Sequence, residues 1–293
     1  MPSTNSVSVS APSAVWGSSQ SEPLDLDKRE VQKQWDNNPC GADTVQGYAR
    51  ESLEYYRAVR DYRYRQYAPW MDEVINFSQW QGKDLLEIGV GMGSDHFRFA
   101  KAGNRMTALD LSREHLRQTE RHLSLEGLTT TAHYGDAEIM PFPDASFDVV
   151  YTFGVIHHTP NTEVAVNEIH RVLRPGGTAI VGLYHRDSWF FWVSTLLAQG
   201  VLKFGLIRKG WRKLLSEIEY RSKDNTAQPL VKVYSRKQSR DLFSDFSQVH
   251  LQTAHLEASH LSRFQLLVRG VSRAELERRF GRYGWYVVVK AVK

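Results

Sequence analysis

Residues Leu85–Gly93 read LLEIGVGMG, an apolar run that ends in glycines at alternate positions, Gly89, Gly91 and Gly93. Such a run predicts a buried strand followed by a sharp turn. Glycine has no Cβ, so a ligand can approach the backbone closely there. The G-x-G-x-G spacing is tighter than the dinucleotide fingerprint G-x-G-x-x-G, and Ser94 stands where its last Gly or Ala would be. The turn therefore suits a ligand without a pyrophosphate. The alternative is a glycine turn that only connects a strand to a helix.

The segments that follow alternate between strands and helices. Further strands are expected at 105–109, 129–134, 147–152, 178–184, 248–255 and 284–290, with helices at 94–102, 112–126, 162–173 and 235–243. This alternation predicts an α/β fold with a parallel, doubly wound sheet. Ligands of such sheets bind outside the carboxyl ends of the strands.

Two acidic residues are expected at that edge. Asp110 lies at the tip of the second strand, where a carboxylate can accept hydrogen bonds from both hydroxyls of a ribose. Such a carboxylate does not distinguish NAD from S-adenosylmethionine, and capping of the next helix is the alternative. Asp136 follows the third strand and can accept from the exocyclic amine of an adenine, or it is a solvated turn residue.

Five motifs occur in order along the chain: LLEIGVGMG (85–93), Asp110, GDAEIMPFP (135–143), FDVVYTFGVIHH (147–158) and EIHRVLRPGG (168–177). With them the sequence resembles the class I S-adenosylmethionine-dependent methyltransferases, in particular the small-molecule branch with the ubiquinone and menaquinone C-methyltransferases. The resemblance is strong over 83–184 and weak over the last two strands. It implies a Rossmann-like seven-stranded sheet of order 3-2-1-4-5-7-6, with strand 7 antiparallel, and S-adenosyl-L-methionine as the cofactor.

The resemblance also implies cofactor contacts for residues at the strand ends. These would hold the methionine part (Glu87, Gly89, Gly91, Gly93), the ribose (Asp110), the adenine (Leu111, Asp136, Ala137) and the sulfonium (Phe153, Gly154).

Histidines follow the fourth strand at the expected pocket mouth. A base is needed only if the methyl acceptor is a weakly acidic OH, NH or CH group, and histidine titrates near neutral pH. His158 is the candidate general base and His157 a weaker one, with structural roles as the alternative for both. Expected acceptor contacts are Tyr184, His185, Trp189 and Tyr64. No metal is expected, because no carboxylate with metal-ligand spacing accompanies these histidines.

The flanking segments suggest additions to this core. Residues 1–24 are expected to be a disordered tail, and 25–80 a helical extension or lid with helices at 48–67 and 69–77. Residues 81–293 would form the methyltransferase domain, with 186–232 as a helical, lid-like insertion after strand 5. An apolar stretch starts at Trp189, and residues 203–240 hold eleven Lys or Arg against three acids. Residues 188–240 are therefore a lid over an apolar acceptor, a peripheral contact with an anionic membrane, or a packing or homodimer element.

Composition narrows the class of protein further. A net charge of +4 does not indicate nucleic acid as a partner. The single cysteine, Cys40, excludes an intramolecular disulfide and fits a cytoplasmic protein. Together with these limits, the resemblance implies a methyltransferase acting at carbon or oxygen, with nitrogen the weaker option, of a small, partly apolar or lipid-like acceptor. The alternatives are a non-catalytic cofactor-binding or interaction protein and an NAD-type oxidoreductase.

Overall fold

The computed structural model describes residues 24–37, 39, 41–219 and 227–293. The expected tail at 1–24 lies outside the described residues except for Leu24. Cys40 and residues 220–226 of the expected insertion also lie outside them.

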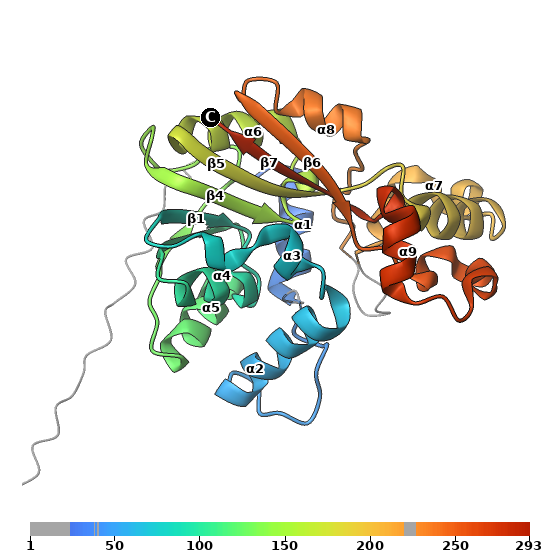
Figure 1. The fold of residues 1–293 in the computed structure, drawn as a ribbon, viewed down its shortest axis with the longest axis horizontal. Helices are drawn as coiled ribbons and strands as arrows, with labels where there is room; N and C mark the ends of the chain where they lie inside the picture. Colours follow the sequence, from blue (N-terminus) through green and yellow to red (C-terminus); the bar gives the residue numbers. More distant parts are fainter. Residues whose placement is uncertain (1–23, 38, 40, 220–226) are drawn as a thin grey trace, which may run out of the picture.

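A single seven-stranded sheet of order β3-β2-β1-β4-β5-β7-β6 organises the described chain (Figure 1). All neighbouring strands are parallel except that β7 runs antiparallel to both β5 and β6, so the predicted order and the antiparallel strand are confirmed. The strands are β1 (Asp84–Ile88), β2 (Arg105–Asp110), β3 (Thr131–Tyr134), β4 (Phe147–Phe153), β5 (Leu173–Tyr184), β6 (Gln248–Ala254) and β7 (Tyr286–Val292).

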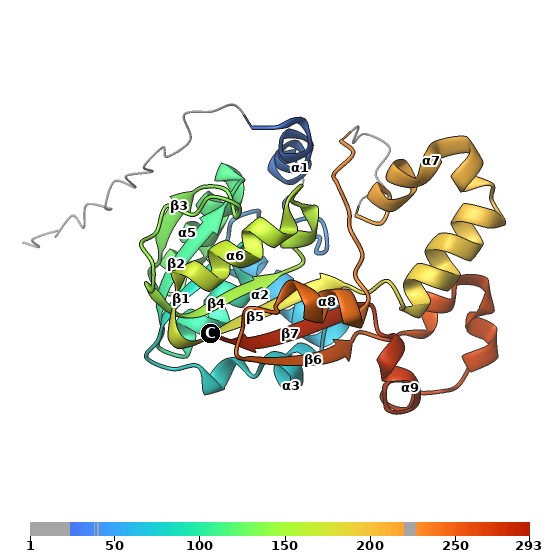
Figure 2. The same cartoon turned by 90° about the horizontal axis from the view of Figure 1, so that it is seen from above.

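Side chains of the central strands alternate between two apolar layers, because successive residues of a strand point to opposite faces. In β1, Leu85 packs with Phe99 on one face, while Leu86 packs with Ile169 on the other, and all four are fully buried. Helices α4 (Ser94–Lys101) and α5 (Arg113–Leu125) cover the first face, and α6 (Thr162–Val172) and α8 (Arg236–Leu242) cover the second (Figures 1 and 2). Ser112 caps α5 as expected, with its Oγ accepting from the His115 amide at 3.1 Å.

The N-terminal extension is helical, but its helices differ from those expected. Helix α1 (Leu26–Asn37) was not predicted, because its sequence is strongly charged and shows no apolar stripe. The helix expected at 48–67 starts only after the N-cap Ser52, as α2 (Leu53–Asp61), and continues as the π-helix η1 (Tyr62–Tyr67). The helix expected at 69–77 is the short α3 (Met71–Ile75), which ends because Asn76 is left-handed with φ 54°, and the 3-10 turn η2 (Phe77–Gln79) follows.

Two helical excursions leave the sheet side by side (Figures 1 and 2). The expected insertion after β5 contains the π-helix η4 (Phe190–Val201) and α7 (Gly205–Ser216). A second excursion between β6 and β7 was not predicted and contains η5 (Ala258–Val268), α9 (Arg273–Phe280) and η6 (Gly281–Tyr283). In the described ranges, no helix combines the length and apolarity needed to cross a bilayer.

The second excursion re-enters the sheet through a close backbone contact at Gly284. A Cβ at this position would overlap the carbonyl oxygen of Ala254, whereas a Cβ at Gly281 would meet no atom within 4 Å. We expect Gly284→Ala to lower the free energy of unfolding by about 1–3 kcal/mol, the usual cost of overpacking. Gly281→Ala is the matched control and should change it little. Urea unfolding of both variants checks this, and equal stabilities would contradict the close-contact argument.

Candidate active site

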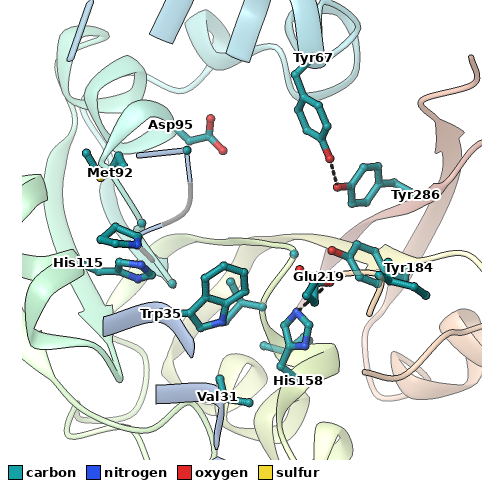
Figure 3. Close-up of a pocket in the computed structure, with 18 of the residues that line it drawn as sticks. Val31, Trp35, Tyr67, Met92, Asp95, His115, His158, Tyr184, Glu219 and Tyr286 are labelled. Carbon is teal, nitrogen blue, oxygen red and sulfur yellow. Dashed lines mark hydrogen bonds and ion pairs between the residues drawn. The ribbon is translucent and has the colours of Figure 1, made fainter. Parts of the chain in front are cut away.

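A cavity of about 940 Å³ opens at the carboxyl ends of β1 to β4. Its wall combines loops of the sheet, the N-terminal extension and both excursions (Figure 3). The volume lies at the upper end of the range for small-molecule sites. Many of the expected site residues line it: Glu87, Gly89, Gly91, Asp110, Leu111, Asp136, Ala137, Gly154, His158 and Tyr184.

The glycine turn after β1 is shaped by backbone conformations that favour glycine. Gly89, Gly91 and Gly93 have φ of 78°, 54° and 71°. A Cβ at Gly89 would collide with the side chain of Val155 in the loop after β4. Gly89 and Gly91 lie on the cavity wall, whereas Gly93 packs against Thr119 and is the N-cap residue of α4. The turn therefore exposes bare backbone to the cavity, as its sequence predicts.

Asp110 ties this turn to the start of α5. Its Oδ2 accepts from the Val90 amide at 2.8 Å, its Oδ1 accepts from the Ser112 amide at 2.8 Å, and His115 Nδ1 lies 3.1 Å from Oδ2. A carboxylate offers about four acceptor positions. Two are used by the backbone amides and a third when His115 Nδ1 carries a proton, so at least one position is left for a ligand.

Helix α1 covers the part of the cavity expected to hold an adenine. Lys28 Nζ lies 2.6 Å from Asp136 Oδ2 and 2.7 Å from Glu138 Oε2. Trp35 projects between the rings of His115 and His158, with centroid distances of 6.3 and 6.2 Å (Figure 3). Neither Lys28 nor Trp35 was a sequence candidate, since only the fold brings α1 to this edge.

Glu87 lies deep in the cavity beside a buried histidine. Its Oε2 is 2.9 Å from His96 Nδ1, and His96 Nε2 is 2.8 Å from Thr130 Oγ1. Burial, and then the nearby Asp95 charge, raise the pKa of Glu87 well above its usual value. Burial lowers the pKa of His96 to about 3, so this ring is neutral and orients the Glu87 carboxyl.

Asp95 at the start of α4 gathers donors from three elements. It accepts from Arg63 at 2.7 and 2.5 Å, from the Tyr151 hydroxyl at 2.7 Å, and from the Tyr64 hydroxyl. Arg63 and Asp95 line the cavity, whereas Tyr64, an expected acceptor contact, does not. Tyr64 instead donates a hydrogen bond to the Asp95 carboxylate.

The two expected catalytic histidines occupy different environments. His158 lines the cavity, and its Nδ1 must donate to the Leu230 carbonyl at 2.6 Å, because a carbonyl can only accept. Its Nε2 faces Glu219 Oε1 at 3.6 Å (Figure 3). His157 is fully buried and off the cavity wall, and neither ring nitrogen has a hydrogen-bond partner within the described chain.

His157 packs against Tyr184 with ring centroids 3.9 Å apart. Burial lowers the pKa of His157 well below its usual value, with the neighbouring His158 adding to the shift. The geometry therefore makes His157 a neutral packing residue. Glu219, the partner of His158, lies in a charged stretch of the sequence and was not a predicted site residue.

Of four other residues expected to contact the acceptor or the cofactor, one lines the cavity and the other three have side chains that pack elsewhere. Tyr184 lines the cavity. His185 Nδ1 donates to the Gly284 carbonyl at 2.9 Å, and burial lowers the pKa of this histidine. Trp189 packs on Phe280 of α9 at 5.0 Å. Phe153 packs on Tyr286 at 4.7 Å, so only its neighbour Gly154 reaches the wall.

Aromatic side chains line the end of the cavity farthest from the glycine turn. Tyr67 and Tyr286 share a hydrogen bond of 2.7 Å between their hydroxyl groups (Figure 3). The aromatic lining there consists of Tyr67, Tyr184, Phe190, Trp285 and Tyr286. This end thus offers flat apolar surface with a few hydroxyl groups.

Two groups of side chains within the described residues have the donor types of a metal site: His157, His158 and Glu219, and His255, Glu257 and His260. In the second group, Glu257 already pairs with His255 at 3.2 Å and with Arg273 at 3.1 Å, and it caps η5. The hydrogen bond from His255 is the main cause that lowers the pKa of Glu257 to about 2. Its acceptor positions are engaged by protein donors, which makes it a structural cap rather than a ligand.

Comparison with known proteins identifies the family of the central part of the chain. A family model described as a methyltransferase domain matches residues 86–181. A sterol 24-C-methyltransferase of Gibberella zeae is 28% identical over 185 residues, which are 53% of this chain and 48% of that protein. A malonyl-acyl-carrier-protein O-methyltransferase of Erwinia billingiae is 38% identical over 112 residues, which are 37% of this chain and 41% of that protein.

The chain therefore spans less than half the length of either relative. Among solved structures, the cyclase SpnF has a TM-score of 0.53 at 15% identity, covering 91% of this chain and 96% of that one. This likeness concerns the fold alone. Residues 86–181 form a methyltransferase domain of the class I S-adenosylmethionine-dependent type, and the cofactor of that domain is S-adenosyl-L-methionine.

Proposed function

We propose that the chain transfers a methyl group to a carbon or oxygen of a small, partly apolar or lipid-like acceptor. One observation carries this proposal. A single cavity joins the cofactor edge, with Glu87 and Asp110, to the aromatic end, with Tyr67, Tyr184 and Trp285. A cofactor and an apolar acceptor would meet inside it without crossing solvent. The names of the two relatives, one acting on a sterol carbon and one on an oxygen, agree with either acceptor atom.

The residues at the cofactor edge fit S-adenosylmethionine. Gly89 and Gly91 present backbone without a Cβ, where a methionine moiety would lie. Asp110 retains one acceptor position for a ribose hydroxyl. Arg63 keeps its Nη1 atom free of any contact with Asp95, so it can donate to the methionine carboxylate while Glu87 accepts from the amino group.

The cofactor, when bound, supplies a methyl group on a positively charged sulfur. The protein then has to hold the acceptor in line and exclude water. His158 and Glu219 can add one proton acceptor. In a neutral ring that donates from Nδ1, the lone pair of His158 is on Nε2, which lies 3.6 Å from Glu219 Oε1. A proton taken from an acceptor hydroxyl would then lie between these two atoms. Burial and then the Glu219 carboxylate raise the pKa of Tyr184, so this phenol stays protonated and can donate.

The remaining parts of the proposal concern the added segments. We propose that residues 25–80 and 186–232 act as lids on the domain formed by 81–293. The contacts of Lys28 with Asp136 and of Glu219 with His158 support this role, since each joins an added segment to the cavity. A homodimer contact through 188–240 is the alternative to contact with a membrane, and a cytoplasmic location belongs to the same proposal. The count of one cysteine supports the last.

Incubation with labelled S-adenosylmethionine and host extract, followed by mass identification of the product, tests the activity. A labelled small molecule supports the proposal. Tight binding of S-adenosylhomocysteine without any transfer would favour a non-catalytic binding protein. Thermal stabilisation by a nicotinamide cofactor instead would favour an oxidoreductase. The test is needed because a fold does not determine its chemistry.

Replacement of the ribose carboxylate should weaken cofactor binding. We expect Asp110→Ala to cost about 1–3 kcal/mol of S-adenosylhomocysteine affinity, because it leaves buried hydroxyl and amide donors without an acceptor. Isothermal titration calorimetry measures the change. Asp241→Ala, which removes an exposed carboxylate paired with Lys237 on α8, is the control. An unchanged affinity for the Asp110 variant would refute the ribose contact.

The raised pKa of Glu87 makes cofactor binding depend on pH. An ammonium group favours the ionised carboxylate, so affinity should rise with pH above the usual titration range of a glutamate, as Glu87 loses its proton. Glu87→Gln cannot ionise and should flatten that rise. Calorimetric titrations at several pH values check both proteins. The same slope in both would show that another group is responsible.

Loss of the His158 side chain should affect turnover more than cofactor binding. With a hydroxyl acceptor, we expect His158→Ala to lower kcat by roughly 100-fold, as for loss of a general base, and to change the cofactor Kd by less than about twofold. Glu219→Gln should follow the same pattern more weakly. His250→Ala, on the exposed side of β6, is the matched control. Parallel losses of kcat and affinity would make His158 a structural residue.

A further inference from the structure

Apolar side chains are exposed together on the two helical excursions. Segments 190–216 and 258–272 come from different parts of the sequence, but η4 contacts both α7 and η5, and both figures place them at the same end of the molecule (Figures 1 and 2). The most exposed apolar residues are Ile207 (84%), Leu267 (81%), Leu266 (70%) and Phe204 (62%). We call this the excursion surface. Apolar patches of this kind mark interaction sites.

The backbone at the turn between η4 and α7 raises the aromatic ring of Phe204 into solvent. Phe204 is left-handed with φ 56°, a conformation that is strained for a bulky side chain. The strain is not compensated by burial of the ring within the described chain. This conformation suits a ring that is buried against a partner.

The excursion surface also has an excess of basic groups. Segments 190–216 and 258–272 contain Lys203, Arg208, Lys209, Arg212, Lys213, Arg263 and Arg269, and no Asp or Glu. Lys209 pairs with Glu217 and Arg212 with Asp27. The charged groups of Arg208, Arg263 and Arg269 have no acidic partner among the residues that the structure describes. A partner for this surface therefore has to be apolar at its centre and negatively charged around it.

The inner side of the same helices forms a wall of the cavity. Ala198, Gln199 and Lys203 come from the first excursion and Ser262 from the second, and all line the cavity. The excursion surface and this part of the cavity wall are thus formed by the same two segments.

We propose that the excursion surface docks on an anionic lipid bilayer. Its apolar side chains enter the interface, and its basic side chains contact lipid phosphate and carboxylate groups. Charge favours this occupant over a second copy of the chain. A two-fold contact places the same surface on both sides, and two surfaces that each have an excess of basic groups would repel each other. The inference deepens the proposed function, because the delivery of a lipid-like acceptor rests on that function. Docking itself needs no cofactor.

Flotation of the full chain with vesicles tests the docking surface directly. We expect binding to phosphatidylcholine vesicles with about 30% phosphatidylserine, and at least about tenfold weaker binding without the anionic lipid or at high salt. The double variant Ile207→Glu with Leu267→Glu should abolish binding. Ile139→Glu, an equally conspicuous apolar residue (73% exposed) beyond β3, is the matched control and should bind normally. The triple variant Arg208→Gln, Arg263→Gln and Arg269→Gln should reduce binding to anionic vesicles only.

Two further readouts keep the outcomes apart. Calorimetry with S-adenosylhomocysteine should give the same affinity for the Ile207/Leu267 variant and the native chain, which shows that the variant is folded. Failure of the native chain to bind the ligand would count against the proposed function and leave vesicle binding as a separate result. Absence of vesicle binding overturns the docking proposal. A dimer in light scattering that the Ile207/Leu267 variant dissociates, without vesicle binding, would identify a second copy as the occupant.

Discussion

The buried carboxylate of Asp95 determines how the N-terminal extension sits on the sheet. A charge at this depth is tolerated only when donors surround it. Arg63 and Tyr64 of η1 and Tyr151 of β4 supply them. These contacts hold η1 over the carboxyl ends of the strands, and η1 in turn carries Tyr67 to its contact with Tyr286. The need to neutralise the Asp95 carboxylate therefore fixes the position of η1 and of the cavity wall that it forms.

Much of the sheet was predictable because its signals are local. The glycine turn at Gly89, the position of Asp110 and the Ser112 cap each depend on residues within a few positions of one another, and the structure has all three. The strand order came from the family resemblance, which covers the same segments. These features require little knowledge of tertiary contacts.

The residues that the sequence did not reveal are placed by long-range contacts. Lys28 reaches Asp136 over more than a hundred positions, and Glu219 meets His158 across the insertion. Both belong to charged stretches that have the pattern of a solvated helix face. Conversely, His157 and His185 follow strands as catalytic residues often do, but the packing of Tyr184 and the Gly284 carbonyl withdraw them from the cavity. Sequence spacing cannot show which side of a loop faces the ligand.

The antiparallel ladder of β7 has a consequence for how the molecule can change. Every residue of β7 pairs with both β5 and β6, from Tyr286 to Val292. The strands on both sides of the excursion at 258–283, β6 and β7, are thus fully paired with each other. The cavity residues Glu87 and Asp110 lie on other strands. Insertions, deletions and substitutions in the excursion can accumulate without altering strand pairing. The fold thus separates a part that is free to diversify from a part that must stay constant.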